Sequence, residues 1–215
     1  QLLCEGQTFG VFQFAGSNIT RVLQQAKPKT IEDIAAVNAI YRPGVIKMGA
    51  LDAFTRRKNG QEDPTNDHHP MFEEILEPTQ GIMIYQEQFI QMFSMLGLSF
   101  GEGDILRKTA ESLDQKKCND YLEEHLYSDS NKLILSMKET KKVADKLIEN
   151  AGYLFNKSHA ISYSILAYWT SYFKAKYPAE FIEVLCNHSA DDHDEIALCL
   201  SMARDLLDSP TITLG

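Results

Sequence analysis

The sequence has only four cysteines, and none lies in a Cys-x-x-Cys arrangement. They are Cys4, Cys118, Cys186 and Cys199. A 24.3 kDa chain of ordinary composition does not need disulfides to hold its core, so this scatter predicts a reducing, cytoplasmic compartment. The cysteines and histidines near the C-terminus match no standard zinc spacing, so we predict no metal ligands among Cys186, His188, His193 and Cys199.

A secretory leader and a membrane span are also missing from the pattern. No basic residues precede an apolar run at the start, and the first residue is Gln1 rather than Met, which suggests a piece of a longer chain. Residues 158–173 lack charged side chains, but this stretch is shorter than a membrane span and carries several hydroxyl groups. We predict a buried helix there and no membrane partner.

The composition is that of a globular protein, with 44% hydrophobic and 24% charged residues. The 215 residues suffice for one large or two small domains, and neither an internal repeat nor a low-complexity linker is present. A net charge of -9 argues against a freestanding nucleic-acid binder. However, residues 27–58 hold seven basic residues against three acidic ones, and the acid concentrates after residue 180.

Acidic residues are absent between Ala151 and Ala179, where Lys157, Lys174 and Lys176 are basic. Ser158 is a good N-cap candidate, and the first turn of a helix there would present free N–H groups beside Lys157 and His159. This pattern suits a phosphate site. The same pattern also begins many buried helices, so both interpretations stay open.

The spacing of apolar residues predicts a mainly α fold with minor β near the N-terminus. We expect a strand or strand-like turn over residues 6–14 and a brief extended piece over 82–84. Thr30, with Asp33 three residues later, predicts a capped helix that ends before Arg42-Pro43-Gly44. The expected helices cover residues 19–25, 31–40, 72–76, 85–96, 102–109, 132–150, 159–176 and 178–207, the last with a possible break near 189–194.

Two further sets of basic residues have two interpretations each. Arg107 and Lys108 could meet phosphate, or could pair with Asp104 and Glu111 one helical turn away. Arg42 could bind phosphate, or could cap the helix that ends before it. Ser158 and His159 are adjacent in sequence, so a helix points them apart and no local catalytic triad is indicated.

Seven ordered blocks of sequence together resemble one family. They are Gly-Val-Phe-Gln at 10–13, the segment 34–44 ending in Tyr-Arg-Pro-Gly, Phe54 with Arg-Lys-Asn-Gly at 57–60, Gly-Ile-Met-Ile-Tyr-Gln-Glu-Gln at 81–88, Gly-Asp-Ile-Leu-Arg-Lys at 103–108, Gly-Tyr-Leu-Phe-Asn-Lys-Ser-His-Ala at 152–160, and Tyr-Pro-Ala-Glu-Phe at 177–181. In order and spacing the chain resembles the α subunit of bacterial DNA polymerase III, a C-family replicative DNA polymerase, over nearly all of residues 5–207.

The resemblance implies that the chain is an irregular multi-helix fingers domain, part of a larger nucleotidyltransferase that copies DNA. It implies a basic part at 1–60, middle helices at 72–150, and a nucleotide-facing helix with an acidic C-terminal helix at 151–207. The implied partners are an incoming dNTP, primer-template DNA, the palm and thumb of the parent polypeptide and, through other regions, replisome proteins such as a sliding clamp.

The resemblance also implies the site residues. Those on the nucleotide side are Arg107, Lys108, Asn156, Lys157, Ser158, His159 and Tyr163. From the basic N-terminal part we assign DNA contact to Arg42, Lys47, Arg57 and Lys58. The family's catalytic aspartates, which hold Mg²⁺ in the palm, have no counterpart here, so we expect the chain alone to be inactive.

The sequence departs from the family pattern at three places. Phe14-Ala15-Gly16-Ser17 stands where an acidic residue and serine are usual, Val45 replaces a proline, and Arg107-Lys108 leads into a segment with few lysines. Each change dilutes polar or basic character. A divergent polymerase is therefore one expectation, and a non-catalytic, polymerase-derived module that acts through protein contacts is the alternative.

Overall fold

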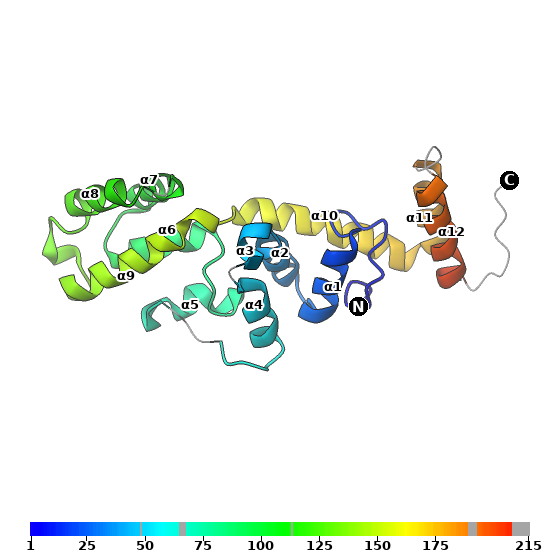
Figure 1. The fold of residues 1–215 in the computed structure, drawn as a ribbon, viewed down its shortest axis with the longest axis horizontal. Helices are drawn as coiled ribbons and strands as arrows, with labels where there is room; N and C mark the ends of the chain where they lie inside the picture. Colours follow the sequence, from blue (N-terminus) through cyan, green and yellow to red (C-terminus); the bar gives the residue numbers. More distant parts are fainter. Residues whose placement is uncertain (48, 65–67, 113, 189–192, 208–215) are drawn as a thin grey trace. The chain divides into compact units, whose positions relative to one another are not determined.

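The computed structural model describes residues 1–47, 49–64, 68–112, 114–188 and 193–207, and within these ranges it is mainly helical (Figure 1). The α-helices are α1 (Ser17–Ala26), α2 (Ile31–Ile40), α3 (Pro43–Lys47), α4 (Ala50–Lys58), α5 (Glu73–Leu76), α6 (Gln86–Leu96), α7 (Phe100–Glu111), α8 (Gln115–His125), α9 (Met137–Glu149), α10 (Lys157–Lys176), α11 (Pro178–His188) and α12 (His193–Leu207). Short 3-10 helices are η1 (Pro70–Phe72), η2 (Glu77–Thr79), η3 (Ser130–Lys132) and η4 (Ala151–Tyr153). The predicted α class is confirmed.

The minor β structure expected near the N-terminus is not present. Residues 6–14 form successive turns, in which the Val11 N–H donates to the Thr8 carbonyl (2.9 Å) and the Phe14 N–H to the Val11 carbonyl (3.1 Å). Gly6 and Gly10 both have positive φ values, which bend the backbone away from an extended strand. In the described part of the chain the one β feature is an isolated bridge between Tyr85 and Phe155, just after the extended piece expected at 82–84.

The chain divides into two compact units. One contains Gln1–Lys27 and Tyr163–Gly215, and the other is Pro28–Ser162, so the boundary falls inside α10. Residues 1–27 and 28–60 belong to different units, and the three-part division expected from the sequence stays a prediction.

In the first unit, α10 holds the N-terminal turns in place. The buried Lys174 ammonium donates to the carbonyls of Gln7 (2.9 Å) and Phe9 (2.8 Å), and the Phe12 N–H donates to the Thr170 hydroxyl (3.1 Å). Helices α11 and α12 pack on each other through Ile182, Met202 and Ala203. These contacts explain why an irregular segment without sheet partners is nonetheless ordered.

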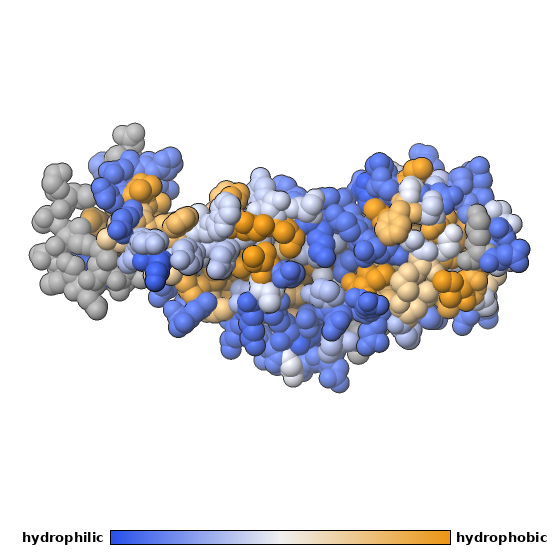
Figure 2. Space-filling view, turned by 180° about the vertical axis from the view of Figure 1, so that it is seen from behind, coloured by the Kyte–Doolittle hydropathy of each residue, from blue (hydrophilic) through white to orange (hydrophobic). Residues whose placement is uncertain are grey.

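Apolar side chains also reach the surface of the first unit. Large aromatic residues at the end of α10 and just beyond it are about half exposed, namely Tyr168, Trp169, Tyr172, Phe173 and Tyr177. Figure 2 shows exposed apolar residues as orange patches on a mostly blue surface. Within the described residues no helix is long and apolar enough to cross a membrane.

In the second unit the core is built by helices α5 to α9. Its centre is aromatic and aliphatic, with Phe72, Phe89, Phe93, Leu106 and Leu147 fully buried. Helix α6 packs against α5, α7 and α9, and α7 packs against α8. The amphipathic pattern read from the sequence is therefore satisfied inside this unit.

Local capping signals fix where several of these helices begin. Thr30 and Asp33 form the predicted capping box at the start of α2. The helix expected over 132–150 begins later, at Met137, because Ser136 and Glu139 form a second capping box there. Helices α3, α4 and α8 were not expected; α8 begins after Asp114, whose side chain accepts a hydrogen bond from the Lys117 N–H (3.1 Å).

A nearly buried ion pair joins α2 to α4 in the second unit. The Lys58 ammonium lies 2.6 Å from the Asp33 carboxylate, and both side chains are only about a tenth exposed, at 11% and 10%. Burial would raise the pKa of Asp33, but hydrogen bonds from Lys58 and from the Lys29 and Thr30 N–H groups outweigh it and keep the pKa below its ordinary value.

We expect Asp33→Asn to lower the free energy of unfolding at neutral pH by about 3 kcal/mol, because it leaves Lys58 without its buried counter-charge. Since the folded-state pKa is lowered, the stabilisation exists above the unfolded pKa and disappears as the pH falls through the folded pKa. Urea unfolding at several pH values measures this. Glu32→Gln, on the exposed side of the same turn, is the control, and a difference from wild type that persists in strong acid would contradict the prediction.

Burial of Lys174 should make the folding stability rise with pH in the alkaline range, whereas the contribution of Asp33 is lost in acid. Burial lowers the pKa of its ammonium to about 8. The folded chain then loses this proton before the unfolded chain does, so stability should rise from about pH 8 towards the ordinary lysine pKa of about 10.4. In urea titrations across this interval, we expect the free energy of unfolding of wild type to rise by about 3 kcal/mol relative to that of Lys174→Met. Lys176→Met, at an exposed position, is the control. A difference in the free energy of unfolding between wild type and Lys174→Met that does not change with pH would contradict the prediction.

Candidate nucleotide site at the start of helix α10

The start of α6 is a polar hub in the second unit. Gln86 donates through Nε2 to the Glu111 carboxylate at the end of α7 (2.9 Å). Gln88 is buried, and its Oε1 accepts from the N–H groups of Ile84 (2.9 Å) and Tyr85 (3.0 Å). These two side chains therefore tie α6 to α7 and to the segment that leads into α6.

Glu87, between them, reaches the start of α10. Its carboxylate accepts from the Lys157 N–H (2.9 Å) and from the Asn156 side-chain amide (3.2 Å). The adjacent backbone is held as well, because the Phe155 N–H donates to the Ile84 carbonyl (2.9 Å). An acidic side chain thus occupies the positive end of the helix dipole.

The predicted N-cap at Ser158 is wrong by two residues. Helix α10 begins at Lys157, and the Asn156 Oδ1 accepts from the His159 N–H (2.8 Å) and from the Ser158 hydroxyl (2.6 Å). Asn and Ser are both favourable caps, and the contact with Glu87 selects Asn156. The N–H groups of Lys157 and His159 are therefore satisfied inside the protein, not free as the sequence suggested.

The side chains of this turn are more accessible than its backbone. Ser158 and His159 are exposed, and Lys157 is partly exposed, with its ammonium 5.7 Å from the centre of the Tyr85 ring. The His159 ring lies edge-on to Phe155 at 5.5 Å. The accessible groups of this turn are therefore an ammonium, an imidazole and a hydroxyl that already donates to Asn156.

Arg107 and Lys108 on α7 form the ion pairs that were one of their two interpretations. The Arg107 Nε lies 3.0 Å from Asp104, its Nη1 pairs with Glu111, and the Lys108 Nζ lies 2.7 Å from Asp104. Hydrogen bonds from Lys108 and Arg107 hold the pKa of Asp104 below its ordinary value. Phosphate contact by these two residues stays a prediction.

The ion pairs bring two of the predicted regions to the same hub. Arg107 contacts Glu111, which accepts from Gln86, and the next residue, Glu87, holds Asn156 and Lys157. Sequence reasoning singled out the 81–88 block but assigned no role to its glutamate and glutamines. Tyr163 belongs to the other unit, where its ring lies 5.4 Å from that of Phe12.

Two of the predicted DNA contacts face inward. Arg57 is buried, pairs with Glu62 (2.8 Å) and donates to the Gln80 carbonyl (3.1 Å), while Lys58 pairs with Asp33. The side chain of Lys47 lies outside the described part of the structure. Contact of these residues with DNA stays a prediction.

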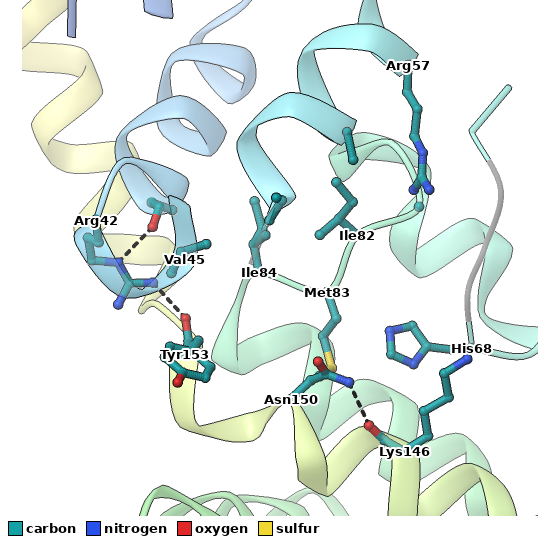
Figure 3. Close-up of a pocket in the computed structure, with 15 residues that line it drawn as sticks. Arg42, Val45, Arg57, His68, Ile82, Met83, Ile84, Lys146, Asn150 and Tyr153 are labelled. Carbon is teal, nitrogen blue, oxygen red and sulfur yellow. Dashed lines mark hydrogen bonds between the residues drawn. The ribbon is translucent and has the colours of Figure 1, made fainter. Parts of the chain in front are cut away.

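Arg42 acts as a cap, and Figure 3 shows its guanidinium bridging two carbonyls. Its Nε donates to Ala39 (2.8 Å) in the last turn of α2, and its Nη2 donates to Tyr153 (2.7 Å). It also lies 4.8 Å from the centre of the Phe155 ring. Gly44 is needed nearby, since a Cβ there would lie 3.0 Å from the Tyr153 ring. The Tyr-Arg-Pro-Gly block therefore packs directly on the block that begins α10.

Among the described residues no group of three or more His, Cys, Asp or Glu side chains could hold a metal ion. Cys199 is buried, and burial, with Cys186 nearby, raises its pKa to about 11. Asp191 and Asp192, two further carboxylates in this part of the sequence, lie outside the described residues.

Comparison with known proteins identifies the fold as a polymerase finger domain. Residues 1–132 match the family model of the bacterial DNA polymerase III alpha subunit finger domain. DNA polymerase III subunit alpha of Saccharopolyspora erythraea is 36% identical over 209 residues, which are 95% of this chain and 17% of that protein. The same subunit of Aquifex aeolicus is 36% identical over 196 residues, 90% of this chain and 16% of that protein. That of Halalkalibacterium halodurans is 38% identical over 192 residues, 86% of this chain and 16% of that protein.

The chain therefore belongs to the finger domain family of the bacterial DNA polymerase III alpha subunit. It spans about a sixth of the length of the curated relatives it matches, at 16% to 17%. The family resemblance read from the sequence blocks is confirmed.

We expect Glu87→Gln to strengthen binding of triphosphate anions to this site. The amide oxygen can still accept from the Lys157 N–H, while a negative charge beside Lys157 is removed. Loss of one such charge near the surface should raise affinity about three- to tenfold and cost the helix about 0.5 kcal/mol. Calorimetric titration with inorganic triphosphate measures this, with the exposed Glu74→Gln on α5 as control. Equal or weaker binding by Glu87→Gln would contradict the prediction.

Proposed function

We propose that this chain is the part of a DNA-directed DNA polymerase that binds the incoming deoxynucleoside triphosphate and the primer-template. The observation that carries the proposal is the meeting of blocks from α6, α7 and α10 at one polar hub in the second unit. Membership of the finger domain family supports it, because the relatives of known name are polymerase subunits.

The phosphate groups of the nucleotide would meet Lys157, Arg107 and Lys108. The two α7 cations are already paired with carboxylates, and a carboxylate and a phosphate accept hydrogen bonds in the same manner. Exchange of Asp104 and Glu111 for phosphate oxygens would therefore need little rearrangement. Cations so placed stabilise the charge that develops during phosphoryl transfer.

The neighbouring polar groups would complete the contact. His159 is exposed on the first turn of α10 and can donate to a phosphate oxygen. Ser158 is exposed as well, and its hydroxyl would donate to phosphate only in exchange for its hydrogen bond to Asn156. Asn156 would act by positioning, because its side chain caps the helix through Ser158 and His159. Contact of Tyr163 with the sugar or base stays a prediction that rests on the family resemblance.

DNA contact would fall to the basic N-terminal part, through Arg42, Lys47, Arg57 and Lys58. Arg42 is the best-supported candidate for DNA contact, because it is partly exposed and has no carboxylate partner among the described residues. Arg57 holds the turn after α4, and Lys58 holds α4 to α2. These two residues would therefore support DNA contact mainly by keeping the surrounding backbone in place.

The bond-forming step would need groups from beyond this chain. The chemistry calls for Mg²⁺ held by converging carboxylates, and the described residues contain no such group. We therefore propose that a palm segment of the parent polypeptide supplies the metal ligands, that its thumb and a sliding clamp act through other regions, and that this chain does not polymerise alone.

A non-catalytic, polymerase-derived binding module is the second candidate. The net charge of -9 and the pairing of Arg57, Lys58, Arg107 and Lys108 with carboxylates favour it, because they leave little free positive charge. A pair of aspartates separated by one residue, in the parent sequence ahead of Gln1, would speak for the enzyme instead.

Primer extension by the full parent polypeptide tests the proposal, with Mg²⁺ and a range of dNTP concentrations. We expect Lys157→Ala and Arg107→Ala each to raise KM for dNTP about tenfold or more, since each removes one charged phosphate contact. Arg107→Lys should recover part of the loss. Lys176→Ala, in the last turn of the same helix, is the matched control and should behave as wild type.

The two candidate functions give different results in this assay. An unchanged KM in both alanine variants would remove the proposed phosphate site. A wild-type parent that never extends a primer would instead favour the non-catalytic module.

A further inference from the structure

A pocket of about 370 Å³ opens in the second unit, beside the Arg42 cap. Figure 3 shows that its lining comes from segments far apart in sequence. Helices α2, α3 and α4, the segment at 81–84, α9 and η4 all contribute. A volume in this range can enclose a small organic ligand.

The lining of the pocket combines positive charge with an apolar surface. Arg42, Arg57, Lys146 and His68 supply the basic groups, and no Asp or Glu is among the lining residues that the structure describes. Arg57 is compensated by Glu62, whereas the Nη1 of Arg42 has no hydrogen bond or ion pair within the described residues. Burial lowers the pKa of Arg42 below its ordinary value, but a guanidinium stays charged at neutral pH.

The uncompensated charge distinguishes Arg42 from the other arginines of this unit. Arg56, Arg57 and Arg107 each pair with a carboxylate. Arg42 is instead fixed by two carbonyls and a Phe155 ring contact, which orient the guanidinium without neutralising it. A rigid, partly desolvated cation at a pocket whose described lining contains no acid is a receptor for an anion.

We propose that this pocket binds one nucleoside monophosphate unit. Its phosphate would meet Arg42 and Lys146, and its base or sugar would lie on Val45, Ile82 and Ile84. Asn150, which donates to the Lys146 carbonyl (2.8 Å) and lines the same wall, offers its amide oxygen to a base edge. The unit could come from an unpaired DNA strand or from a free nucleotide, since both carry the same chemistry.

The inference deepens the proposed function, on which it rests for the choice of a nucleotide rather than another organic phosphate. It concerns residues other than Lys157 and Arg107, which form the proposed triphosphate site. The two sites can therefore be tested separately.

Binding to the full 215-residue chain, measured by calorimetry, tests the pocket. The probes are dTMP, thymidine, inorganic phosphate and an eight-residue oligothymidylate. Lys146→Met removes a charge from an exposed position, and Ala53→Leu fills the pocket from α4 with a good helix former. Lys138→Met is the matched control, because Lys138 is exposed on the same helix but lies about 12 Å away along the axis.

We expect dTMP to bind more tightly than thymidine or phosphate alone. Lys146→Met should weaken dTMP binding about tenfold, because it removes one charge-assisted contact, and Ala53→Leu should abolish it. Lys138→Met should match wild type. If a DNA strand is the natural source, the oligothymidylate should bind much more tightly than dTMP and lose affinity in the same two variants.

The inference is overturned if wild type binds neither dTMP nor the oligothymidylate, or if both bind the two pocket variants as well as wild type. Circular dichroism of each variant excludes unfolding as the cause of a loss. Because KM for dNTP in Lys157→Ala reports on the other site, failure here would leave the proposed function standing.

Discussion

The carboxylate of Glu87 at the start of α10 is the contact on which the candidate site depends. Helix α10 has 20 residues, and the segment from Ala151 to Ala179 contains no acidic side chain to offset the positive end of its dipole. The anion comes from α6, through hydrogen bonds to Asn156 and the Lys157 N–H. One tertiary contact therefore sets the first residue of α10 and places its basic turn beside α6.

The same logic explains how an acidic chain can carry a basic site. Asp104 and Glu111 hold Arg107, and Glu62 and Asp33 hold Arg57 and Lys58. Cations that are paired in advance have restricted side chains, so the proposed exchange of a carboxylate for a phosphate would cost less conformational entropy. The carboxylates thus fix the positions of the basic side chains as well as neutralising part of their charge.

Local signals predicted much of the fold, and tertiary contacts decided the rest. The capping box at Thr30 and Asp33 is confirmed because all its partners lie within four residues. At α10, Asn156 and Ser158 were equally good caps by local rules, and only Glu87, about 70 residues away in sequence, favours the first. The strand expected over 6–14 failed for a similar reason, since a strand needs a neighbour that the local sequence cannot supply. The basic character of residues 27–58 predicts DNA contact by residues such as Lys58, but charge alone does not show that Lys58 turns inward to Asp33.

Arg42 has an observed structural role as a helix cap and a proposed role in binding. As a cap it closes α2 and joins it to η4 through the Tyr153 carbonyl, a contact that the close approach of Gly44 to the Tyr153 ring makes possible. Carbonyl dipoles stabilise a guanidinium less completely than a carboxylate does. A partly buried arginine that is held by carbonyls therefore keeps a positive electrostatic potential around it. A carboxylate partner for Arg42 would also have held the guanidinium, but it would have neutralised its positive charge. The two interpretations of Arg42, helix cap and phosphate ligand, are therefore compatible, because the contacts that fix its position leave its charge available.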